Sequence, residues 1–286
     1  MKTYFALIIS IFITVFFSSK TFALGDLTVT PTRVIFEDRD RAKVLNLVNR
    51  GEKTATYRIE FIEMAMDQYG GFTEIETPQE GQQFSSNMVR YSPRQVTIEP
   101  GESQTIRLIA SKPSNLAVGE YRSHLLMYAV PDNSANAVDI ESVQKLKDKE
   151  VAFQVSAIFR VAIPVIIRHG NEETLQAEYN ITDVKLNASE NSETQEPQLE
   201  FLLTRTGNRS IYADLDVTFT PENSNEQYLL GKIKEYVVYV PNPSRVTKVP
   251  LEIPDNMRLE KGTVNITFYK DKNGNKEILS QSSLTL

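Results

Sequence analysis

Residues 151–167 read VAFQVSAIFRVAIPVII and carry the strongest strand pattern in the sequence. Their apolar side chains recur at alternate positions, which is the period of a β-strand. A typical strand has about 5–6 residues, so a strand of this length must cross a whole sheet or run on into a second domain. The stretch therefore predicts a β-protein in which one long strand reaches a domain boundary.

The two faces of this predicted strand differ in character. One face is an uninterrupted apolar row, formed by Val151, Phe153, Val155, Ala157 and Phe159, whereas the other mixes polar and apolar side chains. If the strand lies at a sheet edge, the row and the backbone beside it could pair with another chain by strand addition. If the strand lies inside, the row packs into the core of its own sandwich, which periodicity alone favours.

Strand-like alternation also fills the rest of the chain, and helical periodicity is almost absent. A polar linker at residues 168–173 follows the long run. Seven further strand-like segments come after the linker, the last two separated by an Asn273-Gly274 hairpin signal. We therefore expect an all-β protein with two immunoglobulin-like β-sandwich domains, at residues 24–168 and 169–286.

Three features divide the first predicted domain. Pro31 interrupts its first strand. Residues 68–83 are rich in Gly, Gln and Glu, so we expect a loop or the tip of a hairpin there. Residues 131–150 are polar and longer than an ordinary hairpin connection, and loops of that length are often functional.

Residues 1–23 have the organisation of a signal peptide. Lys2 gives the positive charge, residues 4–17 are almost uninterruptedly apolar, and Thr21-Phe22-Ala23 resembles a cleavage site. The apolar run is shorter than the roughly 20 residues that span a bilayer. We therefore expect an exported chain that begins near residue 24 and has no membrane-inserted segment.

Charge and cysteine content exclude several classes of function. The sequence holds 31 basic and 37 acidic residues, and without Lys2 and Lys20 the balance is 29 to 37. Such an acidic chain is a poor partner for nucleic acid, which attracts basic surfaces. The sequence has no cysteine, so disulfides, thiolate metal sites and cysteine nucleophiles are excluded.

The sequence contains no recognisable catalytic or metal-binding motif. Its two histidines, His124 and His169, stand outside any known catalytic spacing. We expect a binding protein that is not an enzyme and uses no cofactor or metal. An exported hydrolase with an acidic site, such as one containing Glu172 and Glu173, is an alternative that turnover on a substrate panel would test.

Arg33 and Arg160 each interrupt an apolar segment. A charge in such a place must face water, pair with another group or serve a ligand, because burying it alone is costly. The planar guanidinium suits a carboxylate, so a cleft between domains that held both arginines could capture a chain terminus. A solvated arginine at a sheet edge is the more common explanation.

An ordered set of segments resembles the PapD-like periplasmic chaperones of chaperone–usher pilus systems. The likeness covers residues 27–167, behind a signal peptide and ahead of a second β domain. The segments are PTRVIFE (31–37), LNLVN (45–49), YSPR (91–94), IEPG (98–101), QTIRL (104–108) and GEYRSHL (119–125). The last of these segments and the long polar stretch after it are most similar to the archaic branch of that family.

The resemblance implies two immunoglobulin-like sandwiches arranged as a boomerang and located in the periplasm. It implies that the long strand lends alternate apolar residues to a pilus subunit that lacks its own final strand, and that the subunit is then delivered to an outer-membrane usher. The donor residues would be Val151, Phe153, Val155 and Ala157, with Phe159 as an extension.

The resemblance also implies two basic residues that bind the C-terminal carboxylate of the subunit. Arg33 matches the first, and Arg160 falls at the second, where the best-known members have a lysine. An arginine that fixes the domain angle in those members falls at Pro164 here, and Arg168 is a candidate substitute. The alternative function is an exported structural or adhesive β-sandwich protein, such as a pilin or a carbohydrate-binding module.

Overall fold

The structure is a computed structural model that describes residues 26–37, 39–130, 159–187, 197–254 and 257–286. The predicted signal peptide and the donor residues Val151, Phe153, Val155 and Ala157 lie outside the described residues. Every described element is a strand except one 3-10 turn, Ser86–Met88. No helix among the described residues is long and apolar enough to cross a membrane.

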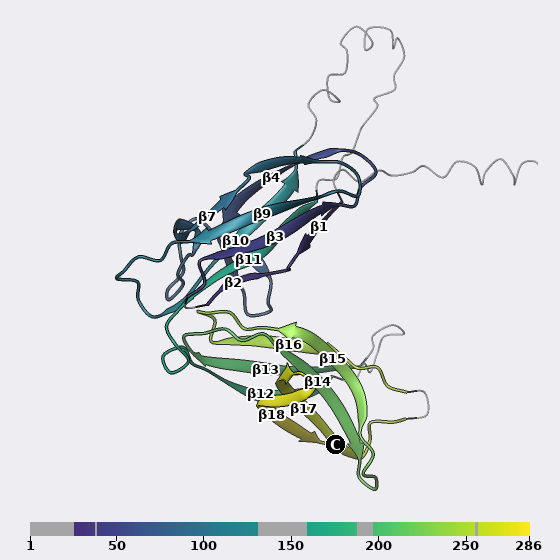
Figure 1. The fold of residues 1–286 in the computed structure, drawn as a ribbon. Helices are drawn as coiled ribbons and strands as arrows, with labels where there is room; N and C mark the ends of the chain where they lie inside the picture. Colours follow the sequence, from purple (N-terminus) through teal and green to yellow (C-terminus); the bar gives the residue numbers. More distant parts are fainter. Residues whose placement is uncertain (1–25, 38, 131–158, 188–196, 255–256) are drawn as a thin grey trace, which may run out of the picture.

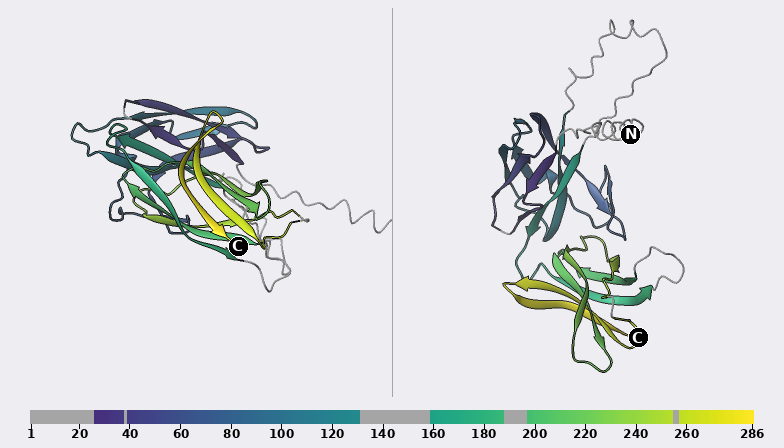
Figure 2. Two further views of the ribbon diagram at one scale, coloured as in Figure 1. Left: turned by 90° about the horizontal axis from the view of Figure 1, so that it is seen from below. Right: turned by 90° about the vertical axis from the view of Figure 1, so that its right-hand side faces the viewer.

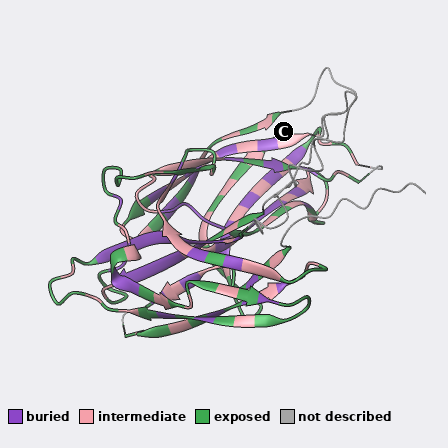
Figure 3. Ribbon diagram, turned by 90° about the horizontal axis from the view of Figure 1, so that it is seen from above, coloured by how far each residue is buried: buried purple, intermediate pink, exposed green. Residues whose placement is uncertain are grey.

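The first sandwich packs a four-stranded sheet against a five-stranded sheet (Figure 1). The first sheet has the order β1 (Leu27–Thr30), β3 (Ala42–Asn49), β9 (Ser103–Ala110), β7 (Val89–Ser92). The second has the order β2 (Val34–Phe36), β11 (Arg160–His169), β10 (Gly119–Ala129), β4 (Ala55–Ile62), β8 (Gln95–Ile98). Buried and exposed positions alternate along many of these strands (Figure 3), as a half-buried sheet requires.

Pro31 divides the first strand of the chain, as predicted. Before it, β1 pairs antiparallel with β3 in one sheet. After it, β2 pairs parallel with β11 in the other sheet. Proline cannot donate a backbone hydrogen bond, so the chain leaves one sheet at this residue and joins the facing sheet three residues later.

Of the long strand predicted at residues 151–167, residues 151–158 lie outside the described residues. Phe159 lies outside the strand, and β11 runs from Arg160 to His169. It pairs with β10 over its whole length, from Arg160 opposite Tyr128 onward.

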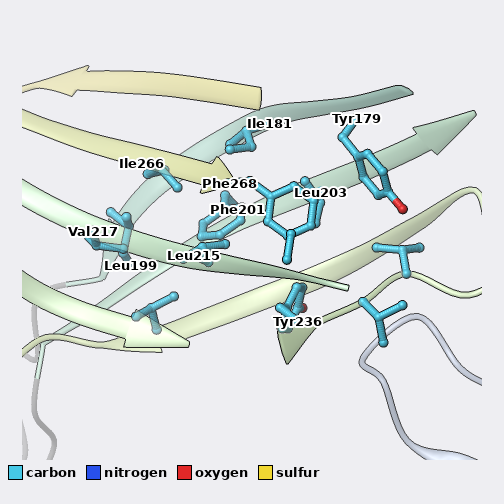
Figure 4. Close-up of a cluster of buried hydrophobic side chains, with 14 of the residues drawn as sticks. Tyr179, Ile181, Leu199, Phe201, Leu203, Leu215, Val217, Tyr236, Ile266 and Phe268 are labelled. Carbon is cyan, nitrogen blue, oxygen red and sulfur yellow. The ribbon is translucent and has the colours of Figure 1, made fainter. Parts of the chain in front are cut away.

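The second sandwich packs a three-stranded sheet against a four-stranded sheet. The first has the order β12 (Ala177–Asn187), β13 (Gln198–Gly207), β16 (Ser244–Pro250). The second has the order β15 (Tyr228–Tyr236), β14 (Ala213–Pro221), β17 (Gly262–Lys272), β18 (Asn275–Thr285). Inward side chains of both sheets, among them Phe201, Leu215 and Phe268, form its core (Figure 4).

The predicted Asn-Gly hairpin joins β17 to β18. Asn273 and Gly274 have φ values of 57° and 88°. Two consecutive positive φ values are what the tightest hairpin turns require, and glycine adopts them without strain. The Asn-Gly dipeptide therefore forms the tight hairpin turn that the sequence predicted.

A small hairpin of the first domain reaches into the second. Its strands are β5 (Met64–Met66) and β6 (Phe72–Glu74). The turn and β6 lie within residues 68–83, predicted as a loop or hairpin tip, whereas β5 precedes that range. Met66 belongs to the buried core of the second sandwich. The carbonyl of Gln68 accepts a hydrogen bond from the Val246 amide at 2.7 Å. The hairpin thus bridges the two domains.

The two sandwiches meet end to end at an angle, forming an elbow (Figures 1 and 2). The all-β prediction, with two sandwiches in a boomerang arrangement, is confirmed. At the elbow, β10 is buried on both faces over almost its whole length. One face points into the first core, and the other lies beneath the β5–β6 hairpin and the second domain.

Candidate binding site at the elbow

Arg33 lies at the junction of the two domains because of the alternation along β2. Val34 and Phe36 point into the core of the first sandwich. Ile35 points the other way and packs against the core of the second sandwich. Arg33, immediately before β2, shares the orientation of Ile35 and therefore faces the second domain.

Two groups of the second domain hold the Arg33 guanidinium. Its Nη2 donates a hydrogen bond to Glu235 Oε1 at 2.6 Å, and its Cζ lies 4.2 Å from the centre of the Tyr212 ring. The hydrogen bond to Glu235 raises the pKa of Arg33, and the same bond lowers the pKa of Glu235. The Arg33 side chain is 26 % exposed, so it is shielded and still reachable from solvent.

An apolar hollow of about 540 Å³ opens beside Arg33. Thr30, Pro31, Thr32, Val34, Ile35, Lys43 and Val44 line it together with Arg33 and Glu235. A second hollow of about 280 Å³ shares Arg33 and Glu235 and is also lined by Lys270, Lys272, Asp214 and Asp271. The elbow thus combines an apolar depression with cations and carboxylates side by side, and a chain end that carries an apolar side chain and a carboxylate could use the depression and the cations.

Arg160 does not join Arg33 in this site. It is exposed at the start of β11, with its Cζ 5.6 Å from the centre of the Tyr128 ring. Since Val34 pairs with Val165, Arg33 is level with Pro164. Arg160 is four residues further along, or about 13 Å at the rise of a strand. The two predicted arginines therefore lie at opposite ends of a strip formed by residues 160–164 of β11, and they do not surround one binding site.

The strip between them is a free sheet edge among the described strands. On one side, β11 pairs with β10 throughout. On the other side, β2 pairs only with residues 165–167. No described strand therefore pairs with residues 160–164 on that side. Pro164 fits such a position because proline within sheets is confined to edges and bulges. Phe159, 51 % exposed, stands just before the strip.

Arg168 ties the two domains together. Its Nε donates to Glu120 Oε2 at 3.0 Å, its Nη1 to Glu37 Oε1 at 2.7 Å, and its Nη2 to the carbonyl of Ser210 in the second domain at 2.7 Å. Burial lowers the pKa of Arg168, but the two carboxylates outweigh it and raise the pKa overall. The substitute position suggested by the resemblance thus lies at the elbow with all three of its guanidinium nitrogens engaged.

Arg122 lies nearby in a very different environment. It is 3 % exposed, with its Cζ 4.3 Å from the centre of the Tyr239 ring and 5.7 Å from that of Phe72. None of its guanidinium nitrogens has a hydrogen-bond partner among the described residues. Desolvation by burial lowers its pKa. Among the described residues it is stabilised by cation–π attraction to the Tyr239 ring and by the negative charges of Glu120 and Glu63.

A pair of tyrosines lies between Arg33 and Arg122. The hydroxyl groups of Tyr212 and Tyr239 are hydrogen-bonded to each other, and their rings meet edge to face at 5.8 Å. Arg33 lies over Tyr212, and Arg122 lies over Tyr239. Sequence reasoning missed Tyr212, Tyr239 and Glu235, because no motif surrounds them and each is far from Arg33 in the chain.

His124 lies on β10 close to Arg122. His124 is buried against the Phe72 ring, and its Nδ1 has no hydrogen-bond partner among the described residues. Burial and the adjacent Arg122 lower the pKa of His124 to about 3. In the part of the chain that the structure describes, no group of three or more His, Asp or Glu residues could hold a metal ion.

Comparison with known proteins finds similarity among solved structures. No family model matches the chain, and no curated protein matches it. The chain is similar to the YadV chaperone, with a TM-score of 0.44 and 13 % identity over 91 % of this chain and 100 % of that one. It is also similar to the CsuC–CsuE chaperone–tip adhesion subunit complex of archaic chaperone-usher Csu pili of Acinetobacter baumannii, with a TM-score of 0.42 and 15 % identity over 88 % and 96 %. The chain is similar as well to the class 5 fimbriae chaperone CfaA, with a TM-score of 0.44 and 13 % identity over 91 % of this chain and 98 % of that one.

Proposed function

We propose that this protein is a periplasmic chaperone that binds pilus subunits by strand addition and delivers them to an outer-membrane usher. The observation that carries the proposal is the edge of β11 at residues 160–164, where none of the described strands pairs on the side that leads to Arg33 at the elbow. A strand edge offers unpaired backbone groups to a guest strand. A partly shielded arginine offers a site for the charged end of that strand.

The pairing of β2 with β11 defines where a guest strand would end. β2 occupies the same side of β11 as the free strip and begins at Val34. A guest strand beside residues 160–164 would therefore lie in line with β2 and stop at Arg33. If the guest ran parallel to β11, as β2 does, its C-terminal carboxylate would meet the Arg33 guanidinium.

The predicted donor residues would continue the contact with the guest from residue 159 back to residue 151. Val151, Phe153, Val155 and Ala157 precede the free strip in the sequence, and Phe159 adjoins it. In the proposal these side chains fill the groove of a subunit that lacks its last strand, with no need for ATP or a metal. Export of the chain is supported by the signal-peptide pattern of residues 1–23.

The test is mass spectrometry of what copurifies with the tagged chain from the native periplasm. The proposal expects a small β-rich subunit in roughly equimolar amount. Arg33→Ala should deplete it, whereas Arg107→Ala, an exposed arginine on β9 of the other sheet, should not. Arg160→Ala is made separately, because the structure places that residue at the far end of the strip.

A variant of the predicted donor row tests the strand addition itself. Phe153→Asp would place a charge in an apolar groove, so subunit recovery should fall. Unchanged recovery would exclude that residue from the contact. If no subunit copurifies although the native appendage genes are expressed, the structural or adhesive alternative becomes the better explanation.

A further inference from the structure

Glu235 reaches Arg33 from an irregular point in the second domain. Across β14 and β15, Ala213 pairs with Tyr236 and Leu215 pairs with Ile233, so Lys234 and Glu235 together face the single residue Asp214. This is a β-bulge, a device that redirects a side chain locally. The Glu235 amide donates to Asp214 Oδ1 at 3.0 Å, which holds the bulge in place.

The backbone of Glu235 has a conformation that favours glycine. Its φ is 53°, which few residues with a side chain adopt. A strained non-glycine residue persists only where its surroundings hold it, and such residues gather at functional sites. Here the strain accompanies a carboxylate that lies 2.6 Å from the Arg33 guanidinium, 202 residues away in the chain.

The Arg33–Glu235 pair is also placed where a ligand would arrive. Both residues line the apolar hollow of about 540 Å³ and the hollow of about 280 Å³ that contains Lys270. The two side chains are 26 % and 57 % exposed, and an ion pair that is partly open to solvent contributes little to stability. An incoming carboxylate would have the same charge and the same hydrogen-bonding atoms as Glu235.

We infer that Glu235 is an intramolecular substitute for the ligand: its carboxylate occupies Arg33 in the free protein and leaves when the C-terminal carboxylate of a partner binds. This inference rests on the proposed function. Glu235 keeps the arginine paired while the site is empty and lowers the affinity for every incoming carboxylate by the same factor. A ligand must therefore add other contacts, such as an apolar side chain in the hollow, to bind tightly.

The test uses two synthetic peptides and the full mature chain. Both peptides are N-acetylated and alternate threonine with valine, and one ends in a free carboxylate whereas the other is amidated. Titration calorimetry compares wild type, Glu235→Gln, Glu235→Gly and Glu200→Gln. Glycine suits the positive φ of residue 235, so that variant removes the carboxylate without adding strain. Glu200 pairs with Lys248 at 3.3 Å, lines neither hollow and is the matched control.

The inference expects both Glu235 variants to bind the free-acid peptide up to about fivefold more tightly than wild type, the most an exposed ion pair is worth. Glu200→Gln should match wild type, and the amidated peptide should show no gain. In wild type, carbon-detected NMR should find the pKa of Glu235 rising toward its ordinary value when the free-acid peptide is added, because Arg33 no longer faces it.

Two outcomes overturn the inference and are distinguishable. If wild type and both Glu235 variants bind the free-acid peptide equally, and Arg33→Ala abolishes binding, the carboxylate site stands and Glu235 is a structural ion pair only. If no form of the protein prefers the free acid to the amide, the carboxylate site itself fails, and the inference fails with it.

Discussion

Arg168 and Arg122 lie on the neighbouring strands β11 and β10, on the same outward face at the elbow, and of the two only the Arg168 guanidinium has hydrogen-bond partners among the described residues. Arg168 pairs in register with Glu120, and Arg122 with Ile166. The exposed fractions are 4 % and 3 %. Burying a charge costs several kcal/mol unless hydrogen bonds and an opposite charge offset it. Replacing Arg168 should therefore destabilise the protein, whereas replacing the equally buried Arg122 should stabilise it.

Arg168→Met is expected to destabilise the protein by about 3–5 kcal/mol, because removing one partner of a buried pair leaves the other charge uncompensated. The charge left behind is Glu120, whose side chain is 1 % exposed. The contact with the Ser210 carbonyl would also be lost, so the domains should separate more easily. Urea unfolding measures the change, and a loss below about 1 kcal/mol would contradict the assigned contacts.

Arg122→Met is expected to stabilise the protein by about 1–3 kcal/mol, since methionine fills similar space between Tyr239 and Phe72 without a desolvated charge. The same urea experiment measures it, with Arg168→Met as the matched comparison. A marked loss of stability would mean that cation–π contact or an unseen water compensates the guanidinium more fully than its surroundings indicate.

The fold was largely predictable because its signals act over a few residues. Alternation identified the strands, Pro31 separated β1 from β2, and Asn273-Gly274 formed the last hairpin. Which strands pair was not predictable in the same way. Pairing depends on distant segments, and the pairing of Arg160 with Tyr128 brings together residues 32 positions apart.

The site was predictable only in part. Arg33 stands out as a charge beside apolar residues, and it does lie at the elbow. Arg160 shows the same pattern, yet it is exposed and over Tyr128. Glu235 gave no signal, because its role depends on a bulge and on the angle between two domains. The predicted roles of both arginines, and of residues outside the described ranges, stay predictions.

Met66→Ala is expected to lower the free energy of unfolding by about 2–4 kcal/mol, the usual loss when a buried methionine is truncated. Met66 is 4 % exposed and comes from the first domain, yet it packs in the core of the second. The loss should therefore weaken the coupling between the domains. Calorimetry should show one unfolding transition in wild type and two in the variant.

Met64→Ala is the control for that prediction, because Met64 lies in the same hairpin and is only half-buried. It should cost less and leave a single transition. Equal effects of the two substitutions would show that the hairpin matters as a whole and that Met66 has no particular part in joining the domains.

The stability of the protein should fall in mild acid because of His124. Its pKa is about 3 in the folded protein, against 6.5 in an unfolded chain. As the pH drops below 6.5, the unfolded state takes up a proton that the folded state still refuses. The stabilising contribution of the neutral ring is thus complete above pH 6.5 and is lost as the pH falls toward 3. Between pH 7.5 and pH 5 the loss should be about 2 kcal/mol.

His124→Phe isolates this effect from the carboxylates, which titrate in both proteins. The variant keeps a ring against Phe72 and removes the titrating group. Glu63 also lies near Arg122, and burial raises its pKa, so it opposes the histidine at low pH in wild type and variant alike. The free energies of unfolding of the two proteins should therefore differ by a constant amount above pH 7. Toward pH 5 the wild type should lose stability relative to the variant. Parallel curves down to pH 4.5 would mean that His124 is protonated in the folded protein, and hence that water reaches the space beneath the β5–β6 hairpin.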